Sequence, residues 1–209
     1  MELRFCRQFT VISGMKFLQR VDDIIMDRSS TFETCFHHAN ALAPLALAGK
    51  LSSMIRTYVR PVVVCVGSDR VAGDSLGPAV GSRLAREGGL TVFGTLEAPV
   101  TAREIAPLRD LLKKAFPRAP VLCVDAAVGE REEIGLVKLL PSPLRPGSGT
   151  RKQLGTIGDL SVLGIVAARE DGFPALENTP LRRVAAMADV ISEALLSLSS
   201  RLPRCTACL

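Results

Sequence analysis

Acidic side chains follow three short apolar segments of the chain. Residues 61–67 are rich in valine and precede Asp74, a second apolar segment precedes Glu97, and a third ends at Asp125. Short apolar runs bounded by turn residues are typical of buried strands in parallel sheets. Ligands of such sheets bind beyond the carboxyl ends of the strands, so we expect these acids to converge on one site.

Two of these acids, Asp74 and Asp125, have the chemistry of a catalytic pair. Two neighbouring carboxyl groups do not both ionise readily, so one keeps its proton. The ionised partner can accept a proton from water, and the neutral one can protonate a peptide carbonyl or leaving nitrogen. Proton transfer of this kind accelerates a reaction by roughly 10²–10⁴. A helix is predicted to begin beside Asp74 and favours its charged form, so we assign Asp74 as base and Asp125 as acid. The simpler alternatives are a helix cap for Asp74 and a strand end for Asp125.

The glycine-rich segment at residues 67–78 also lies where α/β proteins bind nucleotide phosphates. It contains neither the G-x-G-x-x-G nor the G-x-x-x-x-G-K-[S/T] pattern. Asp69 and Asp74 would place negative charge against a phosphate. The residue types therefore favour a carboxylate site over a nucleotide site, and we predict no cofactor.

Strands and amphipathic helices alternate after residue 60, which predicts how these acids are positioned. The apolar runs predict strands at residues 61–67, 90–94, 119–125, 134–140 and 161–168. Helical periodicity and capping patterns predict helices that begin near Asp74 or Ser75, after the Thr101 and Glu104 capping box, and at Thr179 with Pro180 in its first position. This alternation predicts an α/β fold with a mostly parallel sheet covered by helices on both faces.

The remaining segments bound the domain and its partners. We predict an N-terminal extension at residues 1–57 with one helix near 41–55, an α/β domain at 58–200, and a tail at 201–209. The tail contains Cys205 and Cys208, but without a helix or a second cysteine pair this spacing predicts neither a redox nor a zinc site. Scattered basic residues with one Tyr and no Trp do not predict nucleic-acid binding. No apolar run reaches the ~18 residues of a membrane span, no secretory signal is evident, and the cysteine usage favours reduced cytosol.

The motifs around these acids resemble those of the YyaC-like sporulation proteins. Residues 67–70 and 73–78 resemble the family signature GTDRSTGDSLGP, residues 94–99 resemble GTLDxP, and residues 124–129 resemble IDACLG. The resemblance covers about residues 60–198 and continues in order through further segments at 146–149, 157–161, 164–166 and 176–179.

That family is similar to the spore germination protease and, more remotely, to the hydrogenase maturation proteases. The resemblance implies a hydrogenase-maturation-protease-like architecture, with Asp74 and Asp125 at the positions of the germination protease's catalytic pair. The P-G-S-G loop of the germination protease corresponds to Pro146–Gly149. The maturation proteases bind nickel through two acids and a downstream His, and no His follows His38 here, which argues against such a nickel site. Two carboxylates alone also suit magnesium or calcium, but no further residue points to either ion, so we predict no metal.

The resemblance implies an aspartate-dependent peptidase of sporulation or germination, in the cytoplasm of a spore-forming cell. Small acid-soluble spore proteins are the substrates expected by analogy. Amides of Gly147, Ser148 and Gly149 could hold the polarised carbonyl. Two alternatives stay open: a catalytically inactive relative that binds a peptide or protein partner in the same acidic cleft, and a small-molecule hydrolase or nucleotide-binding protein. Further candidates for substrate binding are Asp69, Arg70, Glu97 and Asp159.

Overall fold

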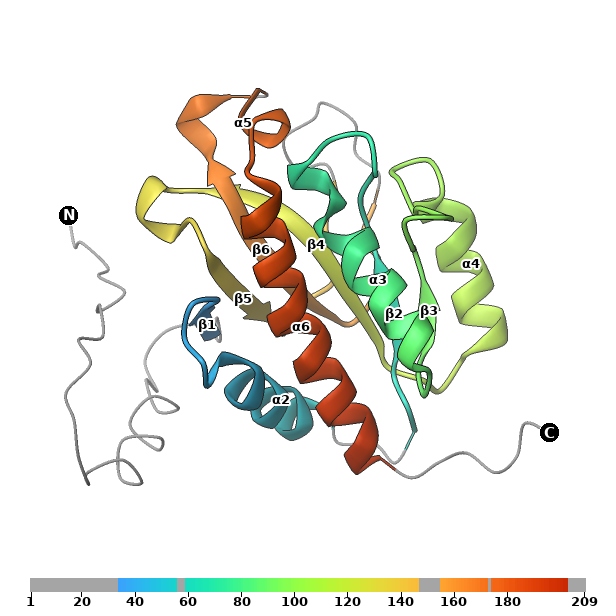
Figure 1. Cartoon of the computed structure of the whole chain (residues 1–209). Coiled ribbons are helices and arrows are strands. Elements are labelled where there is room, and N and C mark those ends of the chain that lie inside the picture. Colours follow the sequence, from blue (N-terminus) through green and yellow to red (C-terminus); the bar gives the residue numbers. More distant parts are fainter. Residues whose placement is uncertain (1–33, 56–58, 147–154, 173, 203–209) are drawn as a thin grey trace, which may run out of the picture. The chain divides into compact units, whose positions relative to one another are not determined.

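The computed structural model describes residues 34–55, 59–146, 155–172 and 174–202. Within these ranges the chain forms one six-stranded sheet (Figure 1). From one edge to the other the strands are β1 (Thr34–His37), β5 (Leu136–Leu140), β6 (Leu160–Ala168), β4 (Val121–Gly129), β2 (Val62–Cys65) and β3 (Thr91–Phe93).

The four strands β6, β4, β2 and β3 are mutually parallel, and β5 and β1 add an antiparallel edge. Every residue of β2 is buried, as its run of valines predicts for a strand covered on both faces. Its last residue, Cys65, pairs with Val124 of β4. The predicted α/β class with a mostly parallel sheet is confirmed.

Helices cover both faces of the sheet. On one face α2, α3 and α6 pack side by side, with α6 between the other two, and α4 covers the other face (Figure 1). None of the helices in the described ranges is long and apolar enough to cross a membrane. The helices are α2 (Ala43–Met54), α3 (Leu76–Glu87), α4 (Ile105–Ala115), α5 (Pro174–Glu177) and α6 (Leu181–Arg201).

Alternate residues of β2 divide the core into two layers. Val63 and Cys65 face α3 and α6, whereas Val62 and Val64 face α4. This division follows from the two-residue period of a strand. The helices pack against the two faces of the sheet through apolar stripes. Leu84 in the stripe of α3 and Ile105 in that of α4 are both fully buried.

Residues 34–55 belong to the same compact unit as the rest of the described chain. The predicted helix at 41–55 corresponds to α2, whose Leu47 and Leu51 are fully buried. The sequence did not predict β1, because its residues Thr34–His37 mix polar and apolar side chains and form no apolar run. Its pairing with β5 defines it instead.

The beginning of α6 differs from the predicted capping pattern. Pro180 occupies the N-cap position, and the helix starts at Leu181. The Thr179 hydroxyl does not cap α6 but donates a 2.8 Å hydrogen bond to the Ala175 carbonyl. The reason is the short helix α5 immediately upstream, whose terminal carbonyls lack helical partners and accept this bond.

Candidate functional site

The chain leaves β2 through a turn that brings Asp74 back to the end of the strand. Gly67 has a φ of 144°, and a Cβ there would overlap the Asp74 carbonyl oxygen and lie 2.9 Å from Cδ of Pro78. The Ser68 N–H donates to that same carbonyl at 3.1 Å and closes the loop. Only glycine permits this close approach, so the turn positions Asp74 directly beyond β2.

Asp125 lies on the neighbouring strand β4, one residue beyond the last position paired with β2. Its Oδ1 accepts a 2.9 Å hydrogen bond from the Ala126 N–H. The chain continues from β2 to β3 on one side and later returns to β4 on the other. The two acids thus flank the point where the strand order reverses, which is where open α/β sheets bind ligands.

The two carboxyl groups are close enough to influence each other's ionisation. Burial, followed by the charge of Asp74, raises the pKa of Asp125 well above its usual range. Burial also raises the pKa of Asp74, partly offset by a hydrogen bond from the Ser68 N–H. Because both pKa values are raised and the charge of Asp74 contributes to the increase at Asp125, the two carboxyl groups favour a state at intermediate pH in which the pair keeps one proton.

Nothing in the described part of the chain neutralises this pair. No lysine or arginine there forms an ion pair with either carboxylate. As whole residues, Asp74 and Asp125 are each partly exposed, whereas the carboxyl group of Asp125 is itself strongly buried. Within the same ranges no group of three His, Cys, Asp or Glu side chains could hold a metal ion. The arrangement has the chemistry of proton transfer to and from water.

Three other predicted residues lie at the same edge of the sheet. Asp69 and Arg70 are exposed in the loop that returns to Asp74, and no ion pair joins them to the described residues. Glu97 follows β3 and accepts a 3.1 Å hydrogen bond from Ser82 of α3. Hydrogen bonds from its own backbone N–H, Thr95 and Ser82 lower the pKa of Glu97.

The remaining predicted residues are not brought to the pair. Asp159 lies at the start of β6, where its Oδ2 accepts a 2.8 Å hydrogen bond from the Val121 N–H at the start of β4. That position is the opposite end of β4 from its carboxyl end. Gly147, Ser148 and Gly149 lie outside the described residues, as do Cys205 and Cys208.

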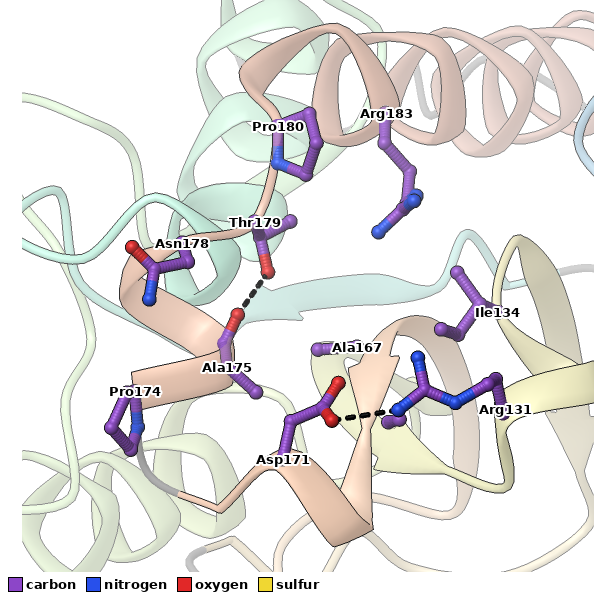
Figure 2. Close-up of a pocket in the computed structure, with 11 residues that line it drawn as sticks. Arg131, Ile134, Ala167, Asp171, Pro174, Ala175, Asn178, Thr179, Pro180 and Arg183 are labelled. Carbon is purple, nitrogen blue, oxygen red and sulfur yellow. Dashed lines mark hydrogen bonds and ion pairs between the residues drawn. The ribbon is translucent and has the colours of Figure 1, made fainter.

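Sequence reasoning missed a cavity of about 330 Å³ beside the turn that carries Asp74 (Figure 2). Arg183 of α6 and Thr179 line it, and a Cβ on Gly73 would lie 3.0 Å from the Thr179 hydroxyl. One signal for this cavity was present in the sequence. Two consecutive arginines, Arg182 and Arg183, follow the Pro180 helix start, where the helix dipole disfavours positive charge.

Comparison with known proteins agrees with these motifs. Over 172 residues the chain is 40% identical to the "Uncharacterized protein YyaC" of Bacillus subtilis (strain 168). The aligned region covers 78% of this chain and 82% of that protein. Residues 35–194 match the family described as "Protein of unknown function (DUF1256)". That match spans β1 through most of α6 and includes both candidate acids. The chain therefore belongs to this YyaC-containing family.

Proposed function

We propose that this chain is an aspartate-dependent peptidase of sporulation or spore germination, in which Asp74 and Asp125 activate water. The observation that carries the proposal is the coupled, partly buried pair of carboxyl groups at the reversal of strand order. Perturbed pKa values at the carboxyl end of a parallel sheet are typical of catalytic acids. A structural ion pair would instead pair each acid with a cation.

The pair supports a division of labour in peptide hydrolysis. Ionised Asp74 would accept a proton from water as the water oxygen bonds to the peptide carbon. Protonated Asp125 would donate its proton to the leaving nitrogen as the carbon–nitrogen bond breaks. Exchange of protons with solvent then resets the pair. This assignment agrees with the causes of the pKa change at Asp125, where burial and the charge of Asp74 both favour the protonated form.

The proposed relationship to the germination protease rests on the motifs around Asp74 and Asp125. On this proposal the fold is of the hydrogenase-maturation-protease type, and the substrates are small acid-soluble spore proteins in the cytoplasm of a spore-forming cell. Backbone amides of Gly147–Gly149 would polarise the scissile carbonyl. The proposed reaction uses no cofactor, metal, nucleic acid or membrane.

Purified full-length protein incubated with small acid-soluble spore proteins tests the proposal. Asp74→Asn and Asp125→Asn should each reduce cleavage by about 10²–10⁴, the usual contribution of general acid–base catalysis. The matched control is Asp110→Asn, which changes an exposed aspartate on α4 and should leave cleavage unchanged.

Three results would contradict the peptidase. They are no cleavage by the unsubstituted chain, full activity in either pair variant, and equal losses in Asp110→Asn. Binding of the spore proteins without cleavage, at an affinity that neither pair variant changes, would favour the inactive relative instead.

A further inference from the structure

The cavity beside the turn that carries Asp74 is lined by both apolar and polar residues. Small apolar side chains line it together with polar side chains, which are two arginines, Asn178, Thr179 and Asp171, the last of them bonded to Arg131 (Figure 2). Its volume of about 330 Å³ is at the lower end of the range for small-ligand sites. The apolar contribution comes from Ile134, Ala167, Ala168, Pro174 and Ala175.

Two contacts connect this cavity to the candidate catalytic acids. Thr179 lines the cavity and lies against Gly73, the residue before Asp74. Ala168 lines it too and pairs with Gly129 at the end of β4, the strand that carries Asp125. A peptide bound across the pair would therefore have the cavity beside it.

The two arginines of the cavity differ in their partners. Arg131 is neutralised by Glu170 at 2.5 Å and Asp171 at 2.7 Å. Arg183 donates one hydrogen bond of 2.9 Å, from Nη1 to the Val166 carbonyl, and forms no ion pair with the described residues. Its side chain is half-buried. A charge withdrawn from water without an opposite charge is costly, so Arg183 is suited to pair with an anion from outside the chain.

The position of Arg183 on α6 strengthens this reading. It lies in the first turn of a 21-residue helix that has no acidic residue in that turn. The positive end of the helix dipole disfavours a cation there and favours an anion. A bound anion would therefore interact favourably with the helix end as well as with the guanidinium.

We propose that this cavity is a substrate subsite that binds a carboxylate of the peptide, with Arg183 as the residue that determines this specificity. The inference rests on the proposed peptidase function. A carboxylate carries one negative charge and matches the single uncompensated guanidinium, whereas Glu170 and Asp171 beside Arg131 repel a doubly charged phosphate more strongly than a carboxylate. The carboxylate could come from an acidic side chain near the scissile bond or from the C-terminus of the peptide.

Three fluorescent decapeptide libraries of the same randomised composition distinguish these sources. One is amidated with a central Glu, one is amidated with a central Gln, and one has a central Gln and a free C-terminus. Binding to the full chain is measured by anisotropy. One carboxylate library should bind about 10–100-fold more tightly than the neutral library, the usual effect of a charged hydrogen bond.

Arg183→Gln should abolish that preference, and Arg183→Lys should keep part of it because the charge remains. Arg182→Gln is the matched control, since Arg182 is the exposed neighbour and does not line the cavity. Equal binding of all three libraries would overturn the subsite. So would equal effects of Arg182→Gln and Arg183→Gln, and so would a preference retained in a folded Arg183→Gln protein.

The outcomes also separate this inference from the proposed function. Carboxylate preference without any peptide cleavage would support the subsite and contradict the peptidase. Cleavage that depends on Asp74 and Asp125 without carboxylate preference would do the reverse. Thermal unfolding of Arg183→Gln, Arg183→Lys and Arg182→Gln shows whether each variant is folded before its binding is compared.

Discussion

Replacing Gly67 by alanine tests whether the turn beyond β2 positions Asp74. The added methyl would overlap the Asp74 carbonyl oxygen and lie 2.9 Å from Cδ of Pro78, in a residue with a φ of 144°. A side chain at positive φ costs about 1–2 kcal/mol, and overpacking costs typically 1–3 kcal/mol. We therefore expect Gly67→Ala to lower the free energy of unfolding by about 2–5 kcal/mol.

Gly88 provides the matched comparison for this experiment. It ends α3 with a φ of 73°, and nothing lies within 4 Å of a Cβ placed there. Gly88→Ala should incur only the backbone cost of about 1–2 kcal/mol. The difference between the two variants, about 1–3 kcal/mol in urea unfolding, measures the contact with the Asp74 carbonyl.

The same pair of variants separates stability from the proposed catalysis. Gly67→Ala moves the backbone of Asp74 and should reduce peptide cleavage under conditions where the protein is folded, whereas folded Gly88→Ala should cleave normally. If Gly67→Ala unfolds within about 0.5 kcal/mol of Gly88→Ala, the ordinary scatter of surface changes, the turn does not depend on this close approach.

Three further predictions concern the stability of the fold. Gly49 is exposed within α2 with open space around it, so Gly49→Ala should raise the urea-unfolding free energy by about 0.5–1 kcal/mol, and a decrease would contradict its helical setting. Leu47 is fully buried, so Leu47→Ala should lower the free energy of unfolding by about 2–5 kcal/mol. Leu45 is 59% exposed, so Leu45→Ala should change it by less than about 0.5 kcal/mol. Equal effects of the two substitutions would mean that α2 does not pack on the core. Burial raises the pKa values of Asp74 and Asp125 in the folded state, so the folded chain retains protons that the unfolded chain releases above about pH 4. Stability should therefore fall as pH rises through the folded pKa values, and thermal unfolding of Asp125→Asn between pH 4 and 8 should show a smaller decline; an unchanged decline would contradict the coupling.

The order of strands and helices was predictable because burial imposes periods on the sequence. The strands β2 and β4 lie in continuous apolar runs, and the apolar stripes of α3 and α4 repeat at the helical period, so each could be recognised. The strand β1 was not recognised, since its residues mix polar and apolar side chains instead of forming an apolar run, and its pairing partner β5 lies about 100 residues later. An edge strand is stabilised by hydrogen bonds to a strand that is distant in the sequence, so its own residues show little pattern that predicts it.

The convergence of Asp74 and Asp125 was predictable for a related reason. Both follow, or lie within, strands whose carboxyl ends meet at one edge of a parallel sheet. Asp159 was also a candidate for substrate binding, yet it precedes its strand, and the parallel register places it beside Val121 at the other edge. Proximity to a strand in the sequence therefore predicts a site residue only when the direction of the strand is included.

Arg183 could not be placed by local patterns, because its surroundings come from the ends of β6 and α5. The sequence does show one locally unfavourable choice, because Arg183 lies in the first turn of α6, where the helix dipole disfavours positive charge. Gly67 and the acid pair are locally unfavourable too. Gly67 loses backbone freedom on folding, and the acid pair buries charge. These unfavourable choices lie along one edge of the sheet, whereas Asp159 at the other edge is satisfied by hydrogen bonds to Val121. Since locally unfavourable choices concentrate where function requires them, we expect the carboxyl edge, including the Arg183 cavity, to be the part of this fold that binds and acts on a substrate.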